Sequence, residues 1–211
     1  MTTVVVMAKE CVPGRVKTRL HPPYSLTDAA AIAAASLDDT LATVQGLTVE
    51  RRVLCIEGAA PPAAGDAFEV VAQAPGGLDD RIAAALDGCR GFTVVIGMDT
   101  PQVTAADLAA VVGEWPGDVD AWFGPAADGG FWLLALREPR GDLVRGVPMS
   151  RADTGARQRA RLVEAGLRVR DLATMTDLDD AASLEHVLRS MPAGSRLART
   201  IGRLSTEEAI A

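Results

Sequence analysis

Four cations in one short stretch are the residues of this chain best suited to chemistry. Lys9, Arg15, Lys17 and Arg19 lie within the sequence KECVPGRVKTRL, although the whole chain has a formal net charge of -7. Phosphate oxyanions are held by backbone N–H groups that glycine leaves accessible and by Lys and Arg side chains, through charge-assisted hydrogen bonds. We therefore predict a phosphate-binding loop from Lys9 to Leu20. The alternative is a solvated basic turn.

Carboxylates at two later places could complete such a site. Asp99 follows the buried-strand pattern 92–96 directly, within the sequence GMDTP. In open α/β sheets, ligands bind beyond the carboxyl ends of the strands, so this acid is placed to meet one. A second group, Asp177, Asp179 and Asp180, stands at the start of the helical pattern that runs to about Met191. Aspartates there also serve as helix caps, so this cluster alone does not predict a metal site.

The elements that must position these residues alternate along the chain. Short apolar runs rich in β-branched residues predict strands, and amphipathic stretches between them predict helices. The expected strands are 3–7, 49–56, 68–72, 92–96, 119–123, 131–136 and 167–172. The expected helices are 25–44, 78–89, 104–115, 150–165 and 176–191. This order favours a single-domain α/β/α sandwich with a mostly parallel, mixed sheet.

Two glycine-rich turns add candidate ligand contacts. Gln73-Ala74-Pro75-Gly76-Gly77 could let a planar base approach the backbone, and Arg81 lies in the first turn of the helix that follows. Asp128-Gly129-Gly130 joins two expected strands and suggests a loop pressed against a ligand. A plain strand-to-helix loop and a simple surface turn are the respective alternatives.

Composition excludes several classes of function. A pI near 4.9 argues against binding of nucleic acid or anionic lipid, because both need a broad basic face. Three widely spaced cysteines indicate reduced thiols, and no segment resembles a signal peptide or a membrane span, so we expect a cytoplasmic protein. We take residues 1–192 as the domain. The tail 193–211 is expected to cover an edge, to pair with a second copy in a homodimer, or to fray.

Several segments together resemble a known family. PGRVKTRL, LDDRIAAAL, GMDTP, GPAADGGFWLLALRE and TDLDDAASL occur in the order found in a bacterial family with the glycosyltransferase-A-type fold, often labelled as transferases associated with arsenosugar biosynthesis. The chain is also similar to guanylyltransferases that activate phospholactate or phosphoenolpyruvate and, more distantly, to those acting on molybdopterin. The resemblance covers roughly residues 3 to 190.

The resemblance implies a nucleotide-binding sandwich that uses Mg²⁺ or Mn²⁺. It assigns Asp99 to the metal, with Asp179 as the second ligand and Asp177 as its rival, and it makes Lys17, Arg19 and Asp99 catalytic. It matches Lys9, Gly14, Arg15, Lys17 and Arg19 to the loop that surrounds the nucleotide phosphates. To these we add Thr18, Gln73, Gly76, Gly77 and Arg81 as candidate nucleotide contacts, and Asp128, Gly129, Gly130 and Ser150 as candidate acceptor contacts.

Three departures from the family pattern bear on the acceptor. Asp79-Asp80-Arg81 stands where the family has Gly-Glu-Arg, Phe131-Trp132 where it has paired Tyr, and Met149-Ser150 where it has Trp-Ser. The leading expectation is transfer of a nucleotidyl group from a nucleoside triphosphate to a small phosphorylated or oxyanionic acceptor, with release of pyrophosphate. Glycosyl transfer from a nucleotide sugar is the second expectation, and an inactive nucleotide-binding module is the third.

Overall fold

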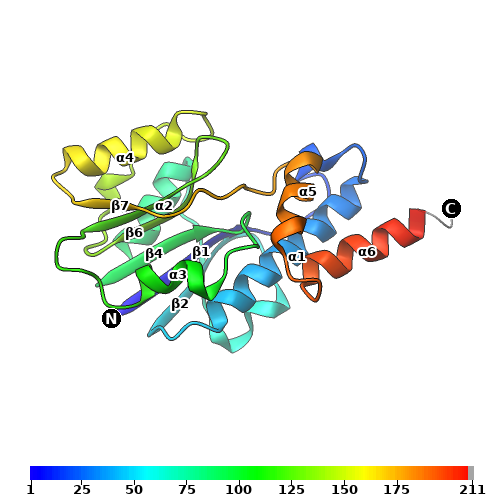
Figure 1. Cartoon of the computed structure of the whole chain (residues 1–211), viewed down its shortest axis with the longest axis horizontal. Coiled ribbons are helices and arrows are strands. Elements are labelled where there is room, and N and C mark those ends of the chain that lie inside the picture. Colours follow the sequence, from blue (N-terminus) through cyan, green and yellow to red (C-terminus); the bar gives the residue numbers. More distant parts are fainter. Residues whose placement is uncertain (209–211) are drawn as a thin grey trace.

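A seven-stranded sheet forms the centre of the molecule (Figure 1). The computed structural model describes residues 1–208. The strands are β1 (Thr2–Lys9), β2 (Arg51–Glu57), β3 (Glu69–Ala72), β4 (Phe92–Gly97), β5 (Ala121–Pro125), β6 (Phe131–Leu136) and β7 (Val169–Asp171). Their order is β3-β2-β1-β4-β6-β5-β7, and β6 alone runs antiparallel to its neighbours. The predicted mixed, mostly parallel sheet is confirmed.

Burial explains why the central strands read as continuous apolar runs. Val4, Val5 and Val6 of β1 are fully buried, because helices cover both faces of the sheet. One core lies between the sheet and helices α1 and α3, and includes Leu37, Leu41 and Leu108. The other lies under α2 and α4 and includes Ile82 and Leu162. The protein is therefore a three-layered α/β/α sandwich.

The helices begin at local capping signals. They are α1 (Leu26–Gln45), α2 (Leu78–Asp87), α3 (Ala105–Val112), α4 (Thr154–Glu164), α5 (Ala181–Ser190) and α6 (Arg196–Glu208). Ser25 and Thr104 accept hydrogen bonds from the backbone three residues on, as N-cap side chains do. Short 3₁₀ turns occupy Thr18–Leu20, Pro62–Ala67 and Gly141–Leu143.

Two predicted helix starts were wrong by several residues. The helix expected from residue 150 begins at Thr154, because Ser150 has a positive φ of 57° and the Thr154 hydroxyl bonds to the backbone of Arg151 and Pro148. The helix expected from residue 176 begins at Ala181, where Asp180 is the N-cap. The capping role thus applies to Asp180, which leaves Asp177 and Asp179 in the extended segment before the helix.

The last two helices pack on α1 at one end of the molecule (Figure 1). Leu197 and Leu204 of α6 share a small core with Leu184 of α5 and Ile32 of α1. The Asp39 carboxylate of α1 accepts from the backbone N–H groups that open α6, at 2.9 Å each, and so caps that helix from a neighbouring element. The part of the tail that the structure describes thus packs against α1 and α5. Residues 209–211 of the predicted tail lie outside the described residues.

One edge of the sheet gathers the ends of β1, β4 and β5 and the start of β6. This follows from the strand directions, since β1, β4 and β5 point the same way and β6 points back. The segments that leave this edge are those that carry the predicted site residues. No helix in the described range 1–208 has the length and apolar character needed to cross a bilayer.

Candidate active site

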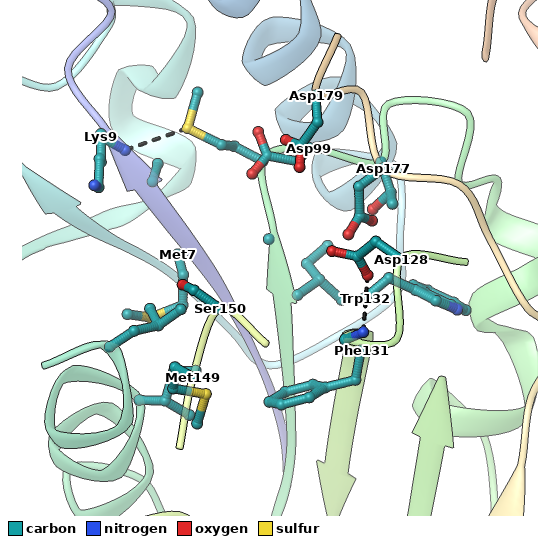
Figure 2. A pocket seen from close by; sticks show the side chains of 18 of the residues that line it. Met7, Lys9, Asp99, Asp128, Phe131, Trp132, Met149, Ser150, Asp177 and Asp179 are labelled. Carbon is teal, nitrogen blue, oxygen red and sulfur yellow. Dashed lines mark hydrogen bonds between the residues drawn. The ribbon is translucent and has the colours of Figure 1, made fainter. Parts of the chain in front are cut away.

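A cavity of about 440 Å³ opens at this edge of the sheet. Figure 2 shows Asp99, Asp177, Asp179 and Asp128 on one side of it, with Met7, Met149 and Phe131 on another. The cavity therefore has a charged wall and an apolar wall. Such a site can accommodate a ligand with a charged part and a less polar part.

Lys17 is the central cation of the charged wall. Its Nζ lies 2.6 Å from Asp99 Oδ1 and 2.9 Å from Asp179 Oδ1, and its side chain is only 6% exposed. Burial by itself would lower the pKa of Lys17, but the two carboxylates outweigh it and raise the pKa above its usual value. Lys17 is thus held as an ammonium ion between two acids.

The backbone at Lys17 is unusual and well anchored. Its φ of 48° and ψ of 38° are left-handed, a conformation that a residue with a side chain adopts at a cost of about 1 kcal/mol. The Lys17 carbonyl accepts from Leu20 N–H at 3.0 Å, and Leu20 is fully buried against α1 and the C-terminal helices. The turn therefore fixes the base of the Lys17 side chain, while its four-carbon stem reaches into the site.

Asp99 and Asp179 are brought together by the backbone. Leu178 N–H donates to the Asp99 carbonyl at 2.8 Å, and Leu178 is fully buried. Ser183 Oγ accepts from Asp179 N–H at 2.9 Å, and Ser36 of α1 donates to the carbonyl of Met98 at 2.8 Å. The two carboxylates are therefore positioned by contacts that do not involve Lys17.

Asp177 and Asp128 add negative charge to the same wall. Their carboxylates point toward one another in Figure 2. Burial raises the pKa of Asp177, three neighbouring carboxylates raise it further, Lys17 opposes the change, and the result is about 7. Asp128 Oδ1 also accepts from Gly130 N–H at 2.8 Å, which fixes its direction. The wall therefore holds more acid than Lys17 alone neutralises.

Lys9 and Arg15 leave their cationic groups available. Among the described residues, no carboxylate lies within ion-pair distance of either side chain, and both line the cavity. They also border a neighbouring hollow of about 150 Å³. Arg19 is 77% exposed and approaches Asp179 only at 3.7 Å. The loop therefore offers three accessible cations to an anionic ligand beside the buried Lys17.

Gln73 and Arg81 are bound to the protein itself. Gln73 Nε2 donates to the carbonyls of Ala8 and Cys55, and its Oε1 accepts from Arg81 Nη1 at 3.0 Å. Arg81 also pairs with Glu57 at 2.5 Å and donates to the carbonyl of Gly76 at 3.1 Å. These bonds join the ends of β1 and β2 to the start of α2. Their predicted contact with a nucleotide stays a prediction.

The Asp-Gly-Gly turn is pressed against the protein. A Cβ atom on Gly129 would lie 2.0 Å from the Ala152 carbonyl oxygen, and one on Gly155 would lie 2.3 Å from that of Gly130. Gly155 N–H donates to the Gly129 carbonyl at 2.8 Å. Gly129 and Gly155 are therefore glycines because the turn lies so close to the start of α4 that a side chain would not fit at either position.

Most of the predicted site residues come together. Those that line the cavity are Lys9, Arg15, Lys17, Thr18, Arg19, Gln73, Asp99, Asp128, Gly130, Ser150, Asp177 and Asp179. Those outside its lining are Gly14, Gly76, Gly77, Arg81 and Gly129. Met7 and Ile82 also line the cavity but were not predicted as part of a site, because they follow the same apolar pattern as the core. Met149 was named only as a departure from the family pattern.

The aromatic pair divides between the cavity and the core. Phe131 lines the cavity and contacts Phe123 with ring centroids 5.6 Å apart. Trp132 borders the cavity but is only 3% exposed, and its Nε1 donates to the Ala173 carbonyl at 3.0 Å. Trp132 thus fastens the segment that carries Asp177 and Asp179 to β6.

The donors present suit a hard divalent cation. Mg²⁺ is bound through one or two carboxylates and keeps several waters, so Asp99 and Asp179 are sufficient in number and type. The excess of acid around Asp177 points the same way, since a cation would relieve it. Among the described residues, no three ligating side chains already form a metal cage. The residues thus suit an ion that keeps water molecules as most of its ligands.

Comparison with solved structures shows that the chain shares its fold with several other proteins. A "putative nucleotide-diphospho-sugar transferase" from Desulfovibrio desulfuricans G20 matches with a TM-score of 0.84 and 23% identity, over 97% of this chain and 95% of that one. The inositol-1-phosphate CTP transferase from T. maritima matches with a TM-score of 0.52 and 10% identity, over 92% and 97%. A CMP:2-keto-3-deoxy-manno-octonic acid synthetase complexed with CTP matches with a TM-score of 0.51 and 13% identity, over 88% and 96%.

The chain belongs to the family described as "Uncharacterized protein conserved in bacteria (DUF2064)". The family model matches residues 40–151, just over half of the 211 residues. The matched range includes Asp99 and Asp128 but neither Lys17 nor Asp179. No curated protein matches the sequence. None of these matches bears on the expected likeness to guanylyltransferases, which stays a prediction.

Proposed function

We propose that the protein is a metal-dependent nucleotidyltransferase. It joins the nucleoside monophosphate unit of a nucleoside triphosphate to a small phosphorylated or oxyanionic acceptor and releases pyrophosphate. The observation that carries this proposal is the pairing of Lys17 with Asp99 and Asp179 beside the accessible cations of the same loop.

Charge favours a triphosphate as the ligand of this loop. A triphosphate carries about four negative charges, and an anionic acceptor approaching it is repelled unless cations intervene. Lys9, Arg15 and Arg19 would hold the terminal phosphates by charge-assisted hydrogen bonds. Attack in line with the departing pyrophosphate then requires mainly positioning and charge stabilisation.

Asp99 and Asp179 would hold Mg²⁺ or Mn²⁺, with Asp177 as the rival of Asp179. When bound, the ion supplies neutralising charge at the α-phosphate. The protein's own contribution is to keep these carboxylates in place through the backbone bond between Leu178 and Asp99. The acceptor would lie beside Asp128, Gly130 and Ser150, against the apolar wall.

The structural neighbours support the class of donor. The synthetase of similar fold is complexed with CTP, and the enzyme from T. maritima is named as a CTP transferase. Both are nucleotidyl transfer proteins by name, and both share the fold with this chain. We place the reaction in the cytoplasm, where free thiols such as those of Cys11, Cys55 and Cys89 are stable.

Glycosyl transfer from a nucleotide sugar is the second candidate. Asp128 favours it, because this carboxylate lines the cavity beside Asp177 and could act as a base or bind a sugar hydroxyl. The name of the Desulfovibrio protein agrees with it. Against it stands the single acid of the GMD segment, where glycosyltransferases of this fold usually present an Asp-x-Asp pair.

A screen of donors distinguishes these functions. The protein would be incubated with Mg²⁺, each of the four nucleoside triphosphates and a panel of phosphorylated and carboxylated acceptors, and pyrophosphate would be measured. We expect release with one triphosphate, and a loss of at least ~100-fold in Asp99→Ala. Consumption of a nucleotide sugar without any pyrophosphate release would establish the second candidate instead. Unchanged behaviour of Asp99→Ala in both assays would indicate an inactive module.

A further inference from the structure

Lys17 occupies the place between Asp99 and Asp179 that a metal ion would need. Its Nζ is 2.6 Å and 2.9 Å from one oxygen of each carboxylate. Magnesium binds such oxygens at about 2.0–2.1 Å, so an ion bridging the same two oxygens would overlap the ammonium group. Two cations cannot share this position.

We propose that Lys17 is an exchangeable counter-ion: it holds the carboxylate pair while the site is empty and yields it to a divalent cation when a nucleotide arrives. This inference rests on the proposed function and adds the order in which the two ligands bind. The metal enters with the nucleotide, since the phosphates give the displaced ammonium group a new anionic partner. Without a nucleotide, a metal ion would have to displace the buried ammonium group of Lys17 into surroundings that are apolar or already crowded with acids.

The anchoring of the site supports this exchange. The turn at Lys17 is fixed by Leu20, so that only the flexible stem has to move. Asp99 and Asp179 are tied to each other by the Leu178 N–H bond and to α5 by Ser183, and these bonds remain when the lysine leaves. The carboxylate pair is therefore preformed for a cation, and Lys17 is the cation that is present.

The neighbouring cations supply a matched control. Lys9 lines the same cavity but makes no ion pair with a described carboxylate. Its removal therefore lowers the electrostatic potential of the cavity but does not free the position between Asp99 and Asp179. Lys17→Met keeps the length of the stem and removes the charge. Lys9→Met does the same at a place where no exchange is required.

Binding of Mn²⁺, followed by electron paramagnetic resonance without nucleotide, tests the exchange. Lys17→Met should bind Mn²⁺ at least ~10-fold more tightly than the wild type, because a unit cation at contact distance no longer competes. Lys9→Met should change the affinity by less than ~3-fold, since its charge makes no ion pair with the two carboxylates and is screened by solvent. Adding Asp99→Asn to Lys17→Met should abolish the gain. Equal affinities of Lys17→Met and Lys9→Met would overturn the proposal.

The wild type provides a second measurement if Lys17→Met does not fold. Mg²⁺ alone should leave the melting temperature almost unchanged. Mg²⁺ with the best triphosphate analogue should raise it by more than the sum of the separate shifts, because binding of each ligand favours the other. Additive shifts would overturn the exchange.

These results are separable from the proposed function. Tighter Mn²⁺ binding by Lys17→Met with no turnover of any triphosphate would leave the exchange standing and remove nucleotidyl transfer. Turnover of a triphosphate by the wild type, with unchanged Mn²⁺ affinity in Lys17→Met, would support nucleotidyl transfer and remove the exchange.

Discussion

The cations that were predicted to contact a nucleotide differ in what they can contact. Lys17 is enclosed by two acids, Arg81 is bound to Glu57, Gln73 and Gly76, and Arg15 faces the cavity without a carboxylate partner among the described residues. The same residue types therefore serve charge compensation, internal bonding and ligand contact. Sequence spacing alone does not separate these roles.

Arg15 and Arg81 form a pair of variants that separates ligand contact from internal bonding. Arg15→Met should weaken binding of the triphosphate roughly 10-fold, the loss of one hydrogen bond to a charged group, and leave the melting temperature unchanged. Arg81→Met should lower the melting temperature by roughly 3 °C or more, because the bonds between the ends of β2 and α2 are lost. Calorimetric titration and thermal unfolding of both variants measure this. A large affinity loss in Arg81→Met without destabilisation would assign the phosphate contact to Arg81.

Elements meet at the site through close backbone contacts. The turn between β5 and β6 lies against the start of α4, and the segment before α5 lies against the end of β4. Sequence predicted the turn and the helix but not this contact. The turn that contains Gly129 was interpreted as an approach to a ligand, whereas Gly129, together with Gly155, permits an approach of the chain to itself. Nothing local in the sequence distinguishes these two causes.

A pair of helical glycines tests the packing of α4. Gly155→Ala should destabilise the protein by about 2 kcal/mol, because its Cβ would lie 2.3 Å from the Gly130 carbonyl oxygen and the backbone would have to shift. Gly202→Ala in α6 has no atom within 4 Å of its Cβ and should stabilise by about 0.5–1 kcal/mol through helix propensity. Urea denaturation measures both. Equal effects of the two substitutions would show that the turn is not packed against α4 as described.

At the scale of the whole molecule, the site depends on the order of the strands. Lys17 and Asp179 are 162 positions apart and meet because the segment before α5 returns past the ends of β4 and β5. Strand periodicity predicted the sandwich and placed Asp99 at the ligand-binding edge, since both depend on local patterns. Asp179 was singled out only through the resemblance, because its pairing with Lys17 is set by topology rather than by neighbouring residues.

The last strand of the sheet is held by an ion pair that should respond to acid. Arg168 donates to the Asp120 carboxylate from Nε, Nη2 and its backbone N–H at 2.7, 2.8 and 2.9 Å, and these bonds hold the pKa of Asp120 well below its usual range.

An aspartate in the unfolded chain has a pKa of ~3.9, so the stabilisation by Asp120 is complete above that pH and is lost as the pH falls toward the lower folded pKa. Asp120→Asn should therefore be less stable than the wild type at pH 7, with a difference that shrinks below about pH 4. Urea denaturation between pH 7 and pH 3 measures this difference. Asp118→Asn is the control, because Asp118 is 65% exposed and, within residues 1–208, bonds only to the Arg170 side chain, so its loss should be smaller. A difference for Asp120→Asn that stays constant over this range would mean that the carboxylate does not fasten β7 through its charge.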